Sequence, residues 1–147
     1  MHPDTSFSSS PAALRTSQRQ ALDFLLERHS PWPLTEPAPS AEELDLVFQA
    51  ALRAPDHGQL RPWRFVLIRG DARVALGNVF ANAARLRDPS DDGERFRAKA
   101  MAAPVLIAIC ARVQSPHKVP ESEQVLAVGA AAMNMLNALH LLGYGGF

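Results

Sequence analysis

The sequence predicts a single domain of mixed helix and strand, in which several helices alternate with two short strands. Its 147 residues and 16.0 kDa are enough for one domain. Hydrophobic residues make up 47% of the chain and charged residues 20%, which is typical of a globular protein and excludes wholesale disorder. Because two strands make a poor sheet by themselves, we expect either that a partner completes the sheet or that the C-terminal part of the domain is absent.

Two helices are predicted near the N-terminus, each from a capping box followed by apolar periodicity. Ser17 with Gln20 predicts a helix over 17–28, and Ser40 with Glu43 predicts a second that ends just after Arg53. The prolines between them predict an extended connection over 29–39.

Two short apolar runs, 65–68 and 105–110, predict buried strands. Between them we expect a helix over 71–87, a polar loop, and a shorter helix that ends near residue 101. The single cysteine, Cys110, lies in the second run, so it is interpreted as a buried and inert thiol. One cysteine also excludes an internal disulfide and a zinc cage of thiolates.

The last predicted helix covers residues 121–142. No charged residue occurs from Val125 to Leu142, a length that meets the lower limit for a membrane span. Asn134, Asn137 and His140 interrupt this stretch, and no basic or aromatic belt flanks it. We therefore interpret it as the central helix of a core or of a subunit interface rather than as a membrane anchor.

Charge and composition limit which partners and which cellular location we expect for the protein. The formal net charge is zero, so no global field attracts nucleic acid. Residues 1–14 are rich in serine and proline and predict a disordered tail, which leaves 15–147 as the domain. The tail lacks the basic start and apolar core of a secretory signal, and with a single cysteine this favours the cytoplasm.

Common catalytic signatures are absent. The sequence contains no GxSxG, GxGxxG, P-loop or HExxH motif. The histidines His29, His57, His117 and His140 do not show metal-ligand spacing, so we expect no metal, although a site built from three of them in space stays an alternative.

Two basic, proline-bounded loops at helix C-termini are the remaining candidates. One is Arg28-His29-Ser30 and the other runs from Arg53 through His57 to residue 63. A helix C-terminus repels a phosphate, so side chains must hold an anion there, and Arg28 with the Ser30 hydroxyl and amide would suit. The alternative is structural: Arg28 compensates its helix dipole, Ser30 makes a turn, Arg53 caps its own helix and His57 is an ordinary loop residue.

At these loops the chain resembles the FMN-dependent nitroreductase family, most closely its small bacterial NAD(P)H nitroreductases. The resemblance runs from about residue 21 to residue 147. It is carried by LLERHS, EPAPSAEEL, ALRAPDHGQLRPWRFVLI, APVLIAICA, HKVPESEQ and ALHLLGYGG. The block over 53–63, which combines RAPDH with PW before a strand, is the specific part.

The resemblance implies an α+β, nitroreductase-like fold, with a central antiparallel or mixed sheet flanked by helices and incomplete in this chain. It also implies an intertwined homodimer with two FMN molecules at the subunit interface. Arg28, His29 and Ser30 correspond to the FMN-binding Arg-Arg-Ser of the family. Arg53 and His57 correspond to residues that reach FMN from the other subunit. The nicotinamide-associated segment falls on Ala138, Leu139, His140, Leu141, Leu142 and Gly143.

The implied activity is hydride transfer from NAD(P)H through FMN to a nitroaromatic or quinone-like acceptor, in a ping-pong sequence. Such a flavoenzyme needs no side-chain nucleophile, which agrees with the missing signatures. His29 departs from the family, where arginine is usual. Relatives also continue beyond the Gly-Gly turn, so we expect a chain that lacks the family's C-terminal segment. The alternative function is a non-catalytic flavin-binding or dimerisation module.

Overall fold

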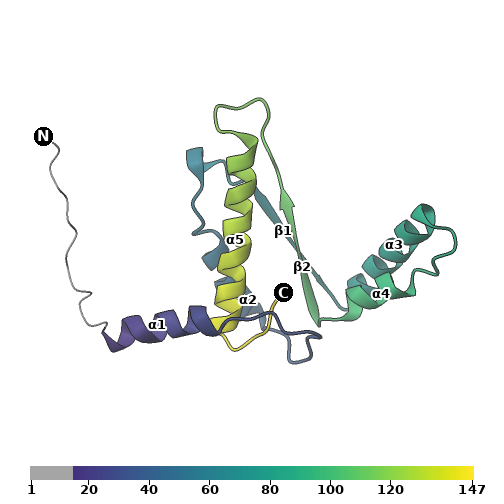
Figure 1. The fold of residues 1–147 in the computed structure, drawn as a ribbon, viewed down its shortest axis with the longest axis horizontal. Coiled ribbons are helices and arrows are strands. Elements are labelled where there is room, and N and C mark those ends of the chain that lie inside the picture. The colour runs from purple at the N-terminus through teal and green to yellow at the C-terminus, as the bar shows by residue number, and fades with distance from the viewer. Residues whose placement is uncertain (1–14) are drawn as a thin grey trace, which may run out of the picture.

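The computed structural model describes residues 15–147, so the tail predicted for 1–14 lies outside the described part. Within these residues, five helices, one 3₁₀ turn and two strands follow one another (Figure 1). In order they are α1 (Thr16–Glu27), α2 (Ala41–Ala51), η1 (His57–Gln59), β1 (Trp63–Arg69), α3 (Asp71–Arg87), α4 (Glu94–Met101), β2 (Val105–Ala111) and α5 (Glu121–Leu141).

The beginning of α2 follows the sequence prediction, whereas that of α1 does not. At α2 the Glu43 amide donates to Ser40 Oγ over 3.2 Å, and the Ser40 amide donates to Glu43 Oε2 over 2.8 Å. This reciprocal pair satisfies two amides that the helix leaves free. The capping box predicted at Ser17 is wrong, because α1 begins one residue earlier and the Arg15 amide donates to Gln18 Oε1 instead.

The two strands form an antiparallel ribbon. Trp63 lies opposite Ala111 and Arg69 lies opposite Val105, so the whole of β1 is paired. At the Arg69 end the ribbon leads into α3 and α4, which pack together as an arm that stands away from the rest of the molecule (Figure 1). Gly93 permits the tight turn before α4, since its φ is +76° and a Cβ there would lie 2.7 Å from Ala81.

The core lies where α2 packs against one face of α5. Eight buried residues form one cluster: Val47, Ala51, Ala54, Trp63, Ala127, Val128, Ala131 and Met135. Asn134, which interrupts the apolar run of α5, donates from Nδ2 to the Ala50 carbonyl over 3.1 Å. The interpretation of α5 as a core helix is therefore confirmed for this face. In the described part of the chain, α5 is the one helix long and apolar enough to cross a membrane.

The prediction that both strands are buried is wrong. In β1 only Trp63 is buried, and in β2 the residues from Ile109 to Ala111 are exposed. Cys110 is therefore exposed rather than buried. A continuous apolar run indicates that both faces of a strand should be covered by other elements. Within residues 15–147, however, α5 and α3 cover little of the ribbon, so most of its side chains stay partly or fully exposed.

Candidate functional site

The first cationic segment, Arg28-His29-Ser30, lies where the chain leaves α1. Arg28 is the C-cap residue, with extended backbone (φ −58°, ψ 125°), and its side chain is half-buried. His29 Nδ1 lies 3.2 Å from the Glu27 carbonyl oxygen. The Arg28 guanidinium forms no hydrogen bond or ion pair with any residue of 15–147, so its charge is uncompensated within the described chain.

The C-terminal end of α5 packs beside this segment. The Phe24 ring meets the His140 ring edge-on, with centroids 6.3 Å apart, and Trp32 meets Phe147 in the same manner at 4.4 Å. Gly145 approaches Pro31 so closely that a Cβ would lie 2.6 Å from its Cγ. The structure thus brings residues 28–30 and 138–143 to the same end of the molecule, which we call the first half-site.

One buried polar atom in the first half-site has no partner in the described part of the chain. His140 Nε2 is buried and unbonded, as is Asn137 Oδ1 one turn earlier on α5. Burying an unbonded polar atom costs free energy, so such atoms mark a place where another hydrogen-bonding group is expected.

The second cationic loop follows α2 and contains η1. Arg53 and His57 are both exposed, and Arg53, like Arg28, forms no side-chain hydrogen bond or ion pair with residues 15–147. The Asp56 carboxylate closes the turn by accepting from the Leu60 amide over 3.2 Å and from the Arg61 amide over 2.7 Å. Beside this loop lies a hollow of about 440 Å³, lined by Leu52, Arg53, Ala54, Asp56, Gln59, Arg61 and Trp63.

The loop is attached to the first turn of α5. His57 Nδ1 lies 2.7 Å from Glu123 Oε2, and Gly58, with φ +78°, packs against Val119. Arg53 and His57, which share this loop, form what we call the second half-site, and His57 is the one that contacts the start of α5. Glu123 is a partner that sequence reasoning missed, because a glutamate in the first turn of a helix is explained by the helix dipole alone.

The first half-site lies at the C-terminal end of α5 and the loop with His57 reaches its N-terminal end (Figure 1), whereas Arg53 comes three residues after Ala50, whose carbonyl accepts from Asn134 in the second half of α5. Glu123 is in the first turn of this helix and His140 in its last turn. At a rise of 1.5 Å per residue, these two positions are about 25 Å apart along the helix axis. In one chain, residues 28–30 therefore lie at the same end of the molecule as 138–143, and Arg53 lies on the same loop as His57. The chain does not bring His57 to residues 28–30.

The chemistry of both half-sites suits an anion. Arginine without a carboxylate partner offers several N–H donors in a fixed fork that matches phosphate. The structural alternative has Arg28 compensate its helix dipole by charge alone, which stays open, and has Arg53 cap its own helix through a hydrogen bond to a carbonyl. Neither side chain forms such a bond within residues 15–147. No group of three His, Cys, Asp or Glu side chains in this part of the chain is arranged to hold a metal ion.

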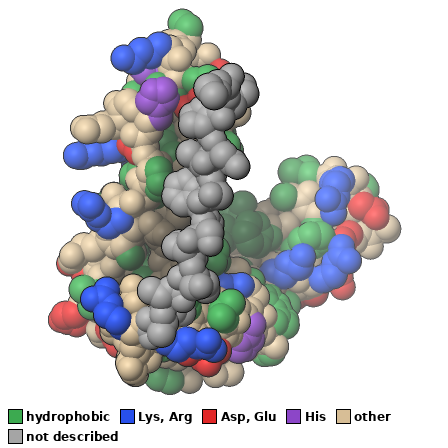
Figure 2. Space-filling model, turned by 60° about the vertical axis from the view of Figure 1, so that its left-hand side comes forward, with side chains coloured by type: hydrophobic (Ala, Val, Ile, Leu, Met, Phe, Trp, Pro, Cys, Tyr) green, Lys and Arg blue, Asp and Glu red, His purple; other side chains and the backbone are tan. Residues whose placement is uncertain are grey.

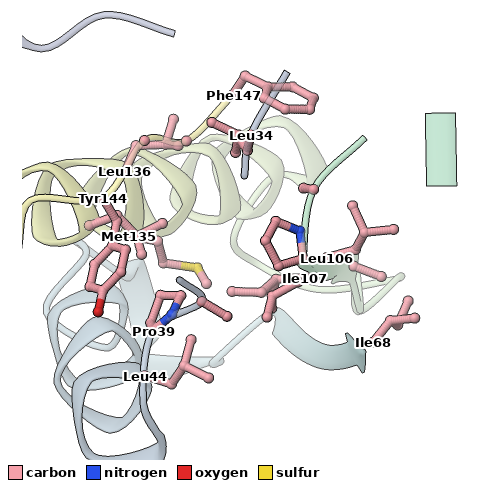
Figure 3. A pocket seen from close by; sticks show the side chains of 18 of the residues that line it. Leu34, Pro39, Leu44, Ile68, Leu106, Ile107, Met135, Leu136, Tyr144 and Phe147 are labelled. Carbon is pink, nitrogen blue, oxygen red and sulfur yellow. The ribbon is translucent and has the colours of Figure 1, made fainter. Parts of the chain in front are cut away.

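A second hollow, of about 570 Å³, is lined by no residue of the cationic segments 28–30 and 53–63, although Leu139 of the first half-site belongs to its lining. Figure 3 shows its apolar lining, with Ile107 from β2 directed toward Met135 from α5, Leu106 directed the other way, and Phe147 at the edge. Apart from Lys99, Thr35 and the Tyr144 hydroxyl, the lining side chains are apolar. It is therefore mainly an uncovered apolar flank of the ribbon, with Lys99 as its one charged side chain.

Comparison with known proteins relates this arrangement to a family. The model of the family described as "Nitroreductase family" matches residues 25–147. The Escherichia coli (strain K12) protein named "Putative NAD(P)H nitroreductase YdjA" is 36% identical over 127 residues, which are 86% of this chain and 69% of that protein.

Solved structures agree with the sequence comparison. The crystal structure of a nitroreductase-like family protein from Bacillus cereus superposes with a TM-score of 0.75 at 20% identity, covering 93% of this chain and 70% of that one. A "putative nitroreductase in complex with fmn" from Desulfovibrio desulfuricans gives a TM-score of 0.63 at 27% identity, covering 83% of this chain and 63% of that one. The α+β, nitroreductase-like fold expected from the sequence is confirmed, and the chain belongs to the nitroreductase family of oxidoreductases.

Proposed function

We propose that the protein is an FMN-dependent oxidoreductase that works as a homodimer in the cytoplasm, with residues 15–147 forming its flavin-binding domain. It would transfer hydride from NAD(P)H to a nitroaromatic or quinone-like acceptor. The likeness to an FMN complex at 27% identity and to a protein named as an NAD(P)H nitroreductase supports this choice of cofactor and co-substrate.

The residues of the first half-site fit the phosphate end of FMN. The uncompensated Arg28 guanidinium and the exposed Ser30 hydroxyl supply donors for a dianionic phosphate. The His29 imidazole lies next to them in the chain, with its Nδ1 near the Glu27 carbonyl oxygen. The segment Ala138 to Gly143 then lines the neighbouring surface, where the unbonded His140 Nε2 is ready to pair with a ligand atom.

The observation that carries the proposal is the separation of the half-sites. In one chain about 25 Å of α5 lies between Glu123, the partner of His57, and His140, and an FMN molecule is shorter than that. His57 can therefore reach the same flavin as Arg28 only from a second copy, and we place Arg53 with His57 because the two residues share one loop. A two-fold axis that joins the first half-site of one chain to the second half-site of the other builds two equal sites.

The exposed apolar surface supports the same dimer. The face of α5 that points away from α2 carries Val125, Leu126 and Met133, which are 52%, 71% and 42% exposed, with Gly129 open between them. In α1, Leu22, Leu25 and Leu26 are exposed as well. Figure 2 shows hydrophobic side chains on the surface, including the recess between the body and the α3–α4 arm. Apolar surface on this scale is typical of subunit interfaces.

The division of labour follows from this geometry. FMN, when bound, would supply the redox chemistry, that is, hydride transfer between NAD(P)H and the second substrate. The protein holds the phosphate with Arg28, orients the ring between two chains and leaves one open groove that NAD(P)H and the acceptor occupy in turn. A ping-pong rate law follows from that shared groove.

Mixing two inactive variants tests the shared site. We expect Arg28→Ala and Arg53→Ala each to weaken FMN binding without changing the far-UV circular dichroism spectrum. In a heterodimer of the two variants, one site carries both substitutions and the other carries none. After unfolding and refolding of an equal mixture, about a quarter of the wild-type FMN sites should return, because half of the dimers are mixed and each has one intact site.

The controls separate the alternatives. Each variant refolded alone should recover no sites, and an equal mixture that also recovers none would contradict the shared site. Unchanged flavin affinity in Arg28→Ala, measured by fluorescence titration, would contradict the phosphate assignment. Yellow protein that never bleaches when NADPH is added would point instead to the non-catalytic flavin-binding module.

A further inference from the structure

We infer that Glu123 is a positioning residue for His57. Its carboxylate accepts a hydrogen bond from Nδ1–H of the imidazole and thereby presents Nε2 to the flavin edge of the second half-site. This inference rests on the proposed function, because it assigns a role to a residue within the same site. It concerns the contact of 2.7 Å between His57 Nδ1 and Glu123 Oε2, which joins positions 66 residues apart in the sequence.

The backbone around His57 is held independently of Glu123. Asp56 accepts two amide protons from the residues that close the η1 turn. The next residue, Gly58, lies against Val119, where a Cβ would come within 3.2 Å of Cγ2. Val119 is itself held, since its carbonyl accepts from Nε2 of the buried Gln124 over 3.1 Å. These contacts fix where the ring is attached, but none of them fixes which way the ring faces.

Glu123 supplies the missing orientation. It stands in the first turn of α5, beside the loop that carries His57. An ionised carboxylate can only accept hydrogen bonds, so Nδ1 must carry the proton whether the ring is neutral or charged. Nε2 is then the free atom: it accepts when the ring is neutral and donates when the ring is protonated.

The exposure of the pair argues for positioning rather than for stability. The side chains of His57 and Glu123 are 66% and 47% exposed, and exposed ion pairs contribute little to folding. Without the carboxylate, the imidazole can rotate about χ2 and exchange its proton between the two nitrogens. The effect of the pair is therefore expected at the ligand and not in the melting temperature.

The test begins without flavin, on the full-length ¹⁵N-labelled apo-protein. The His57 ring signals are identified by their loss in His57→Gln. We expect the neutral ring to show a protonated Nδ1 and an unprotonated Nε2. In Glu123→Ala the signals should move toward the Nε2-protonated form, whereas Glu123→Gln should keep the original pattern because its amide oxygen still accepts. Glu121→Ala is the matched control, since Glu121 is an exposed glutamate in the same helical turn.

The second readout is FMN affinity by fluorescence quenching. Glu123→Ala should raise the dissociation constant by about two- to tenfold, the range expected for one lost hydrogen bond. Glu123→Gln and Glu121→Ala should each stay close to the wild-type value.

Two results would overturn the inference. One is an unchanged His57 tautomer in Glu123→Ala. The other is an equal loss of FMN affinity in Glu123→Ala and Glu121→Ala, which would show that only the charge at the start of α5 matters. If the wild-type protein binds no FMN, the proposed function fails, but the ring signals of the apo-protein still decide whether Glu123 orients His57.

Discussion

Tyr144 connects the end of the described chain to the beginning of α2. Its hydroxyl donates to Glu43 Oε2 over 2.8 Å, and the Tyr144 amide donates to the Leu139 carbonyl over 2.9 Å. The same Glu43 carboxylate belongs to the capping box with Ser40. One residue therefore holds both the first turn of α2 and the segment that follows α5, beside the first half-site.

These bonds shift two pKa values in opposite directions. The Ser40 amide first, and the Tyr144 hydroxyl second, lower the pKa of Glu43 below its ordinary 4.5. The Glu43 carboxylate raises the pKa of Tyr144 above its ordinary 10.0. A lowered carboxyl pKa stabilises the fold above the unfolded value, and this stabilisation is lost as the pH falls through the folded value. A raised phenol pKa stabilises the fold below the unfolded value, and this stabilisation is lost as the pH rises through the folded value.

We expect Tyr144→Phe to be less stable than the wild type only in the pH range between the protonation of Glu43 and the ionisation of Tyr144. At neutral pH its urea midpoint should be lower, and the difference should shrink below pH 4.5 and again above pH 10. Urea titrations of both proteins across this pH range, monitored by circular dichroism, measure the difference in midpoint. A difference that stays constant at every pH would show that the hydroxyl acts through packing alone.

At the scale of elements, α5 serves two purposes. One face packs against α2 and buries Val128, Ala131 and Met135, while its two ends carry the two half-sites. The helix thus sets the distance between the sites and supplies much of the core. The strands depend on the same packing, because Trp63 at the start of β1 is buried in that cluster.

Truncation of a core methionine should show how much this packing contributes. Met135 is 3% exposed, so Met135→Ala should lower the free energy of unfolding by about 2–5 kcal/mol through lost burial and a residual cavity. Met101, at the end of α4, is 44% exposed, and Met101→Ala should change the free energy of unfolding by less than about 0.5 kcal/mol. Denaturant unfolding of both variants measures the difference, and equal losses would contradict the assignment of the core.

At the scale of the whole molecule, the described chain leaves much apolar surface uncovered. The outer face of α5, the leucines of α1 and the flank of the ribbon are all exposed in one copy. Exposed apolar stripes of this kind are uncommon on a monomer. A second copy that covers α5 and α1 would bury them and would assemble the two half-sites in the same step.

A charge on the outer face of α5 should separate the subunits. Leu126 is 71% exposed, so Leu126→Asp should leave the fold of one chain intact but place a buried, unpaired carboxylate in the interface. Size-exclusion chromatography with light scattering should show a monomer that no longer binds FMN. Leu86→Asp is the control, because Leu86 is 88% exposed on the α3 arm, and that variant should stay dimeric. A dimeric Leu126→Asp protein would contradict this interface.

The sequence by itself determined the order and type of the elements. Helical periodicity and the Ser40 capping box predicted α2, and apolar runs between prolines and glycines predicted both strands, because these signals act within a few residues of each other. It also singled out Arg28, Arg53 and His57, since arginine beside proline-fixed loops stands out locally. Burial was predicted poorly: Cys110 lies in an apolar run and is nevertheless exposed, because cover comes from elements far away in the chain.

The tertiary structure alone decided how the candidate residues are grouped. No local pattern relates His57 to Glu123 or Tyr144 to Glu43, because these pairs are 66 and 101 residues apart in the sequence. Nor does any pattern show that the segment of Arg28 and the residue His57 lie at opposite ends of α5. That separation follows from the packing of α2 and α1 along one long helix, a distance that is set only when the chain folds.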